Sequence, residues 1–131
     1  MIVLDTHAWI WWVNEDEESG QNHWRDLVRN ADRIAVSSIS CFEVAWLAQH
    51  GRIKLKMPMQ DWFKKASSGS GIEIQDISPQ IAETAVTLPE HHSDPQDRLI
   101  MATAIVHGAQ LISADGKFSK YEELSNLLVR I

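Results

Sequence analysis

Five short apolar runs, separated by segments with helical periodicity, are the feature that most constrains the fold of this chain. The first run, residues 1–5 (MIVLD), is wholly apolar until its final acid, which is typical of a strand buried on both faces. The other expected strands are residues 33–37 (RIAVS), 72–77 (IEIQDI, an edge strand), 110–113 (QLIS) and 127–131 (LLVRI). Strands that alternate with helices predict an α/β fold, with a central parallel sheet of about five strands and helices on both faces.

Helix signals fill the segments between these strands. Helices are expected to begin after Asp5, near Ser19, at Ser40, at Pro58, at Ser78 and at Asp94. The residues SCFE at 40–43 fit a capping box, in which Glu43 would reach back to the backbone of Ser40. The strongest signal follows Asp94 and ends at Gly108, and its expected apolar face consists of Leu99, Ala102, Thr103 and Val106.

Length and composition narrow the class of protein. The 131 residues predict a single domain, residues 1–131, with room for a hydrophobic core. Cys41 is the only cysteine, which excludes an internal disulfide and fits a cytoplasmic setting. No apolar run has the length of a membrane span, and residues 1–5 do not read as a signal peptide. The net charge of −6 argues against non-specific nucleic-acid binding, although not against a nucleic-acid substrate.

Four acids fall where a strand has just ended or a helix has just begun. Asp5 and Asp115 follow the first and fourth expected strands, while Glu43 and Asp97 lie near the starts of two helices. Each acid alone has a structural explanation, since Asp5 could be an N-cap, Glu43 part of a capping box, and Asp97 a favourable charge in a first helical turn. Asp94 is explained fully by its role as an N-cap before Pro95.

Taken together, the four acids predict a metal site. The carboxyl ends of parallel strands share one edge, and ligands of open α/β sheets bind beyond it. Carboxylates crowded there repel one another, and a hard divalent cation with a preference for oxygen ligands relieves that repulsion. His91 and His92 could bind a softer metal, but we interpret them as solvated loop residues. A serine hydrolase is not indicated, because the chain has no G-x-S-x-G motif.

Four stretches of the sequence resemble one known family. They are residues 1–12 (MIVLDTHAWIWW), 36–53 (VSSISCFEVAWLAQHGRI), 91–104 (HHSDPQDRLIMATA) and 111–121 (LISADGKFSKY). In this order, and spanning nearly the whole chain, they resemble the PIN-domain ribonucleases, specifically the VapC-type toxins of toxin–antitoxin pairs.

The resemblance implies roles for particular residues. It matches Asp5, Glu43, Asp97 and Asp115 with the family's four catalytic acids, of which Asp5, Asp97 and Asp115 are the expected direct metal ligands. Glu43 would bind the metal directly, bind it through water, or orient the nucleophile. Thr6 and Ser113 match supporting hydroxyls, although a threonine is usual at position 113. Gln96 stands where an aromatic or apolar residue is frequent.

The resemblance also implies an activity and partners. It implies Mg²⁺-dependent endonucleolytic cleavage of RNA, with Mn²⁺ as a substitute, a homodimer, and an antitoxin that blocks the site. We expect Trp11 to contact a partner, because a short helix with three tryptophans cannot bury them all. Trp46, one turn beyond Glu43, is expected to extend the same contact surface, with a place in the core as the alternative. Two alternatives stay open: a different metal-dependent phosphohydrolase such as a phosphatase with Asp5 as nucleophile, disfavoured by His7, and a non-catalytic binding module.

Overall fold

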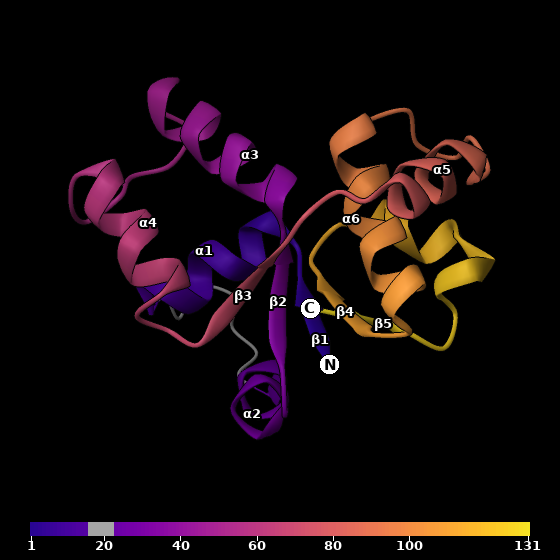
Figure 1. Ribbon diagram of the computed structural model, residues 1–131, viewed down its shortest axis with the longest axis horizontal. Coiled ribbons are helices and arrows are strands. Elements are labelled where there is room, and N and C mark those ends of the chain that lie inside the picture. Colours follow the sequence, from indigo (N-terminus) through magenta and orange to yellow (C-terminus); the bar gives the residue numbers. More distant parts are fainter. Residues whose placement is uncertain (16–22) are drawn as a thin grey trace.

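A five-stranded, fully parallel sheet forms the centre of the protein, whose computed structural model describes residues 1–15 and 23–131. The strand order is β3-β2-β1-β4-β5, so β1 lies in the middle and β3 at an edge, as its alternating sequence predicted (Figure 1). The strands are β1 (Ile2–Leu4), β2 (Ile34–Ser37), β3 (Ile72–Gln75), β4 (Gln110–Ser113) and β5 (Leu128–Arg130). The predicted α/β fold is confirmed.

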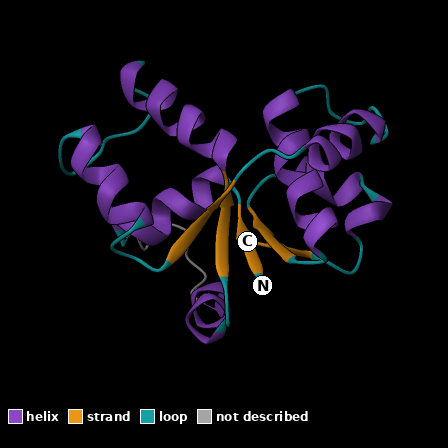
Figure 2. Cartoon of the chain, viewed as in Figure 1, coloured by secondary structure: helices purple, strands orange, loops and turns teal. Residues whose placement is uncertain are grey.

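Helices cover both faces of this sheet. Helices α1, α3 and α4 lie on one side and α5 and α6 on the other (Figures 1 and 2). The described helices are α1 (Thr6–Asn14), α2 (His23–Asn30), α3 (Ser38–Gln49), α4 (Met59–Ser67), α5 (Pro79–Thr87) and α6 (Pro95–His107), with 3-10 helices η1 (Gly116–Lys120) and η2 (Glu122–Leu124). The predicted helix start near Ser19 lies outside the described residues. None of the helices within the described ranges is long and apolar enough to cross a membrane.

Alternation along β1 divides the hydrophobic core into two layers. Ile2 and Leu4 pack with Trp9 of α1 and Trp62 of α4, while Val3 packs into the opposite layer with residues of α6. Successive side chains of a strand point to opposite faces, so a wholly apolar strand requires cover on both sides. This arrangement explains why the first run of the sequence has no polar residue before Asp5.

Helix α6 is apolar on two sides because it lies between the sheet and α5. The predicted apolar face of α6 is present in the structure. Its residue Ala102, however, packs with Ile81 and Ala85 of α5 and not with the sheet. The sheet side of α6 is formed by Ile100 and Met101, which are fully buried. The predicted ends hold, since Asp94 caps the first turn and Gly108 closes the helix with a left-handed φ of 59°. Glycine adopts that conformation without steric cost.

The predicted capping box of α3 is wrong. The helix begins at Ser38, directly after β2, and its N-cap is Ser37, whose hydroxyl accepts a hydrogen bond from the Ile39 backbone N–H at 3.3 Å. Because the strand passes into the helix without a loop, Ser40 already lies inside the first turn. Glu43 therefore lies beyond the capping position and is available for another contact.

Candidate active site

The carboxyl edge of the sheet contains a cavity of about 330 Å³ at the ends of β1 and β4. Chain order reverses here, since β2 lies on one side of β1 and β4 on the other, and such a switch point is where open α/β sheets bind ligands. The cavity is lined by Asp5, Thr6, His7, Trp11, Glu43, Asp97, Ala114 and Asp115. The four acids singled out in the sequence thus line one cavity, with Thr6 and Trp11 beside them.

Asp5 is the most constrained of the four acids. Its Oδ1 accepts a hydrogen bond from the Ala8 backbone N–H at 2.8 Å and so caps α1, while its Oδ2 accepts one from the Ser113 hydroxyl at 2.7 Å. Burial raises the pKa of the Asp5 carboxyl, and the bonds from Ser113 and Ala8 oppose that rise. The N-cap role expected of Asp5 is therefore real, and it coexists with a position in the cavity.

Glu43 is held from the neighbouring element instead of capping its own helix. The Thr6 hydroxyl lies 2.8 Å from Glu43 Oε1, to which it donates, and 3.0 Å from the buried Ser40 hydroxyl. Burial raises the pKa of Glu43, and the negative charge of Asp97 adds to the effect. Thr6, expected to be a supporting residue, thus connects α1 to α3 by this contact. The contact lies at the rim of the cavity, the edge formed by the four acids.

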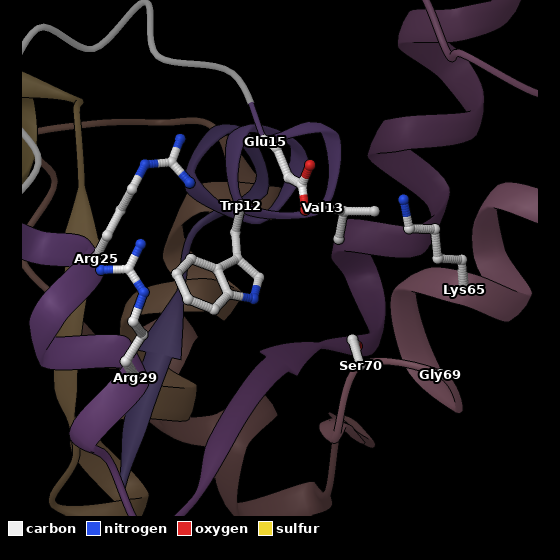
Figure 3. Close-up of a pocket in the computed structure, with 8 residues that line it drawn as sticks. All are labelled: Trp12, Val13, Glu15, Arg25, Arg29, Lys65, Gly69 and Ser70. Carbon is white, nitrogen blue, oxygen red and sulfur yellow. The ribbon is translucent and has the colours of Figure 1, made fainter.

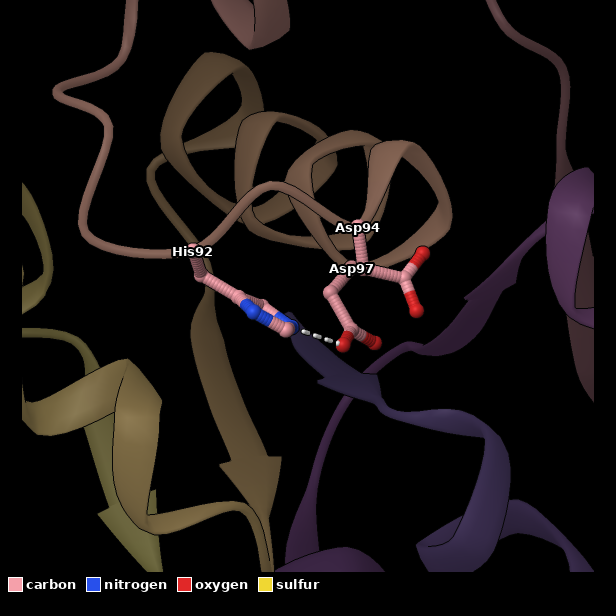
Figure 4. A group of neighbouring side chains, drawn as sticks. All are labelled: His92, Asp94 and Asp97. Carbon is pink, nitrogen blue, oxygen red and sulfur yellow. Dashed lines mark hydrogen bonds and ion pairs between the residues drawn. The ribbon is translucent and has the colours of Figure 1, made fainter.

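Asp97 extends from the first turn of α6 and meets His92 from the preceding loop. Figure 4 shows the two side chains pointing toward each other, with His92 Nε2 at 2.5 Å from Asp97 Oδ2. Burial raises the pKa of Asp97, and the charges of Asp94 and Asp115 raise it further. The interpretation of His92 as a solvated loop residue is wrong, because its side chain is only 11% exposed. No spacing rule signals this contact, which depends on the path of the loop.

Ser113 connects the fourth acid to the first. Its buried hydroxyl donates to Asp5 and accepts from the Asp115 backbone N–H at 3.0 Å. Asp115 Oδ1 in turn accepts from the Lys117 backbone N–H at 2.9 Å and caps η1. Ser113 thus provides a hydroxyl at the position where the resemblance led us to expect a threonine.

Arg98, next to Asp97, fixes the loop that carries His92. Its guanidinium is buried and donates to five backbone carbonyls, at 2.5 to 3.2 Å. The acceptors are Ala85, Val86 and Leu88 at the end of α5, and Pro89 and His92 in the loop. The carbonyls at a helix end have no partner within the helix, so Arg98 satisfies them and ties the loop down. No local sequence pattern predicts this role.

The donor set of the cavity fits a hard divalent cation. All four acids supply oxygen, and the pKa values of Asp5, Glu43 and Asp97 are raised because the charged forms are desolvated or face one another. Mg²⁺ and Mn²⁺ prefer carboxylate oxygen and would favour the ionised forms. His92, Asp94 and Asp97 also bring one potential ligand atom each within 4.8 Å of one another.

A second cavity, of about 660 Å³, has a different character (Figure 3). Arg25 and Arg29 of α2 lie beside the Trp12 ring, and Lys65 of α4 faces them across the cavity. Gly69 and Ser70, which also line it, precede β3, so this cavity lies toward the amino ends of the strands. It is therefore separate from the acidic cavity at the carboxyl ends.

Comparisons with known proteins agree with this geometry. A family model of the PIN domain matches residues 2–124. The chain is 37% identical over 121 residues to ribonuclease VapC22 of Mycobacterium tuberculosis, covering 92% of this chain and 91% of that protein. Its fold is similar to the crystal structure of VapBC2 from Rickettsia felis bound to a DNA fragment from their promoter, with a TM-score of 0.69 and 25% identity over 99% of this chain and 98% of that one.

A further solved structure supports the fold alone. It is DNA-bound VapBC from Salmonella typhimurium, with a TM-score of 0.67 and 20% identity over 93% of this chain and 92% of that one. Fold and site together define a parallel α/β protein with an acidic cavity at its topological switch point. The chain belongs to the PIN-domain family and, within it, to the VapC proteins.

The raised carboxylate pKa values predict how the metal-free protein responds to pH. A group whose folded-state pKa is raised stabilises the fold below its ordinary pKa, and that contribution is lost as pH rises through the folded value. Asp5, Glu43 and Asp97 all act in this direction. In EDTA, the melting temperature of the wild type should therefore fall relative to that of Asp97→Asn as the pH rises above the ordinary aspartate pKa of about 3.9.

The matched control is Asp76→Asn, which removes the same charge from the exposed turn after β3. Its melting temperature should follow that of the wild type across the series. Parallel curves for the wild type and Asp97→Asn would show that Asp97 carries no desolvation cost in the folded protein.

Proposed function

We propose that this chain is a Mg²⁺-dependent endoribonuclease, with Mn²⁺ as a substitute, that acts as the toxin of a toxin–antitoxin pair. The observation that carries the proposal is the convergence of Asp5, Glu43, Asp97 and Asp115 on one cavity. Support comes from the family, since a relative of 37% identity is a ribonuclease and structural relatives are VapBC complexes. We also propose that residues 1–131 act as one domain in the cytoplasm.

Asp5, Asp97 and Asp115 are the proposed metal ligands. When bound, the ion would acidify a coordinated water and neutralise charge that develops on the phosphodiester. The chain's own contribution is to hold the ligands in place: Ser113 and the Ala8 N–H fix Asp5, and the Lys117 N–H fixes Asp115. Each carboxylate oxygen has two lone pairs, so these bonds leave room for an ion.

Glu43 is the proposed group that orients the attacking water. Thr6 engages its Oε1, which sets the direction of the carboxylate and leaves Oε2 able to accept a hydrogen bond. Burial and the charge of Asp97 raise the pKa of Glu43, which makes it a better proton acceptor than an exposed glutamate. Direct or water-mediated binding of the ion by Glu43 is compatible with the same geometry.

The phosphatase alternative is disfavoured by the residue at position 7. A phosphatase with Asp5 as nucleophile would be expected to have a second acid two residues later, whereas this chain has His7 there. The binding-module alternative gains no support from Glu43, whose proposed capping role the structure excludes. The absence of a second acid at position 7 favours hydrolysis by water over a covalent intermediate.

Glu43→Gln tests the catalytic proposal. The amide oxygen can still accept from Thr6, so stability should change by at most about 1 kcal/mol. Cleavage of RNA with Mg²⁺ or Mn²⁺ should nevertheless fall by about 100-fold or more, because the proton acceptor is lost. Gel electrophoresis of a mixed RNA substrate measures the loss, and the wild-type products should carry no cyclic phosphate because water is the nucleophile.

Asp76→Asn again serves as the charge-matched control and should cleave like the wild type. Equal activity of wild type and Glu43→Gln would remove Glu43 from the mechanism. Intact RNA after incubation of the wild type with either ion, across varied sequences, would contradict the nuclease proposal and favour a binding module.

An exposed aromatic pair on α3 is the proposed contact with the antitoxin or with the second protomer of a homodimer. Trp46 is 42% exposed and Phe42, one turn earlier, is 57% exposed. The Trp46 ring stacks on His50 at 4.0 Å between centroids, with the Arg52 guanidinium 5.9 Å from its centre. Trp11 is half-buried and lines the acidic cavity instead, so its proposed contact would be with a partner that covers the site.

Trp46→Ala should therefore weaken binding of the antitoxin by about tenfold or more while leaving the melting temperature nearly unchanged. Val86→Ala, which shortens another exposed apolar side chain (78% exposed) on α5, is the matched control. Calorimetric titration with the antitoxin expected from the adjacent short reading frame measures the affinity. A Trp46→Ala protein that melts much lower yet binds as tightly would show that Trp46 stabilises the fold and not the complex.

A further inference from the structure

His92 is a partly buried side chain beside the acidic cavity that has no role in the proposed function described above. It comes from the loop between α5 and α6, and its Nε2 lies 2.5 Å from Asp97 Oδ2 (Figure 4). The two side chains are only 11% and 19% exposed, so water competes little for this contact. The contact between His92 and Asp97 is a specific polar interaction, which packing alone does not explain.

The backbone of His92 is fixed from two directions. The Arg98 guanidinium donates to the His92 carbonyl at 3.1 Å, and the Tyr121 hydroxyl lies 3.4 Å from the same oxygen. Arg98 also binds the carbonyls of Leu88 and Pro89, which ties the start of the loop to the end of α5. Because these bonds hold the loop, the imidazole can contact Asp97 without the entropy cost of ordering a mobile loop.

We propose that His92 is a positioning residue for the metal ligand Asp97. Its Nε2–H donates to Oδ2, fixes the carboxylate rotamer and leaves Oδ1 for the ion. The inference rests on the proposed metal site and adds a residue to it. Ligating carboxylates in proteins are commonly hydrogen-bonded in this way by outer groups that set their orientation.

The electrostatics of the rim explain why Asp97 needs such support. Asp94 and Asp115 both act on Asp97 with like charge, which would turn an untethered carboxylate away from the cavity. Asp94 cannot take over the role of tether, because it is an acceptor and its Oδ1 already caps α6 through the Gln96 N–H at 2.9 Å. His92 is the side chain that the structure places against Asp97, and its Nε2 can carry the proton that this role requires.

The alternative is that His92, Asp94 and Asp97 bind the ion together, since their ligand atoms lie within 4.8 Å of one another. If Nε2 were the ligand atom, it would have to give up its bond to Asp97, because one ring nitrogen cannot donate a proton and bind a metal at once. The observed contact favours the positioning role. The two arrangements differ in whether nitrogen touches the ion.

Calorimetric titration with Mn²⁺ alone, on the wild-type protein and three variants, tests the proposal. His92→Asn, whose amide is too short to reach Asp97, should weaken Mn²⁺ binding about tenfold or more. His92→Gln, which places an N–H where Nε2 stands, should restore most of the affinity. His91→Ala, at the exposed neighbouring histidine that contacts Tyr121, is the control and should bind as the wild type does.

Melting curves in EDTA confirm that each variant is folded, and the rescue by His92→Gln separates positioning from a general loss of structure. Unchanged affinity in His92→Asn would overturn the inference while leaving the metal site intact. A nitrogen coupling in the pulsed electron paramagnetic resonance spectrum of bound Mn²⁺, lost in His92→Gln, would overturn it by showing direct ligation. A wild type that does not bind Mn²⁺ would overturn the proposed metal site, and this inference with it.

Discussion

Desolvation of carboxylates at one edge of a parallel sheet, with repulsion from neighbouring acids added at Glu43 and Asp97, is the constraint on which the rest of the structure depends. Asp5, Glu43 and Asp97 lie in partly or fully desolvated positions, and their pKa values are raised. Left untethered, such groups would turn toward solvent or stay protonated. The chain instead holds each one with a specific hydrogen bond: a backbone N–H and Ser113 donate to Asp5, Thr6 donates to Glu43, and His92 Nε2 contacts Asp97. Local stability is thereby exchanged for the acidic cavity at which we propose that a cation binds.

The topology of the sheet is what brings these acids together. Asp5 follows β1, Asp115 follows β4, and Glu43 and Asp97 come from α3 and α6, which start at the same edge. The cap roles of Asp5 and Asp115 and the position in the cavity are not competing explanations, since one side chain serves both. A helix N-terminus supplies N–H donors that hold a carboxylate in place, and the same carboxylate faces outward to the ligand.

Much of this arrangement follows from the sequence, because it depends on local patterns. The apolar run before Asp5 predicts the central strand, and Asp94, Pro95 and Gly108 predict both ends of α6. The convergence of the four acids also follows, since parallel strands share their carboxyl edge; their catalytic roles stay predictions. Contacts that depend on loop paths did not follow. The start of α3 at Ser38 displaced the expected capping box, and the approach of His92 to Asp97 depends on Arg98, which no local pattern reveals.

The central claim is that the rim binds a divalent cation through its carboxylates, and calorimetry with Mn²⁺ on the Asp5→Asn, Asp97→Asn double variant tests it most directly. The wild type should bind with a dissociation constant in roughly the micromolar-to-millimolar range, as expected for a site with few protein ligands. The double variant should show no binding heat, yet melt in EDTA at or above the wild-type temperature at neutral pH, because two desolvated charges are gone. Binding of Mn²⁺ by the double variant with wild-type affinity would contradict the account.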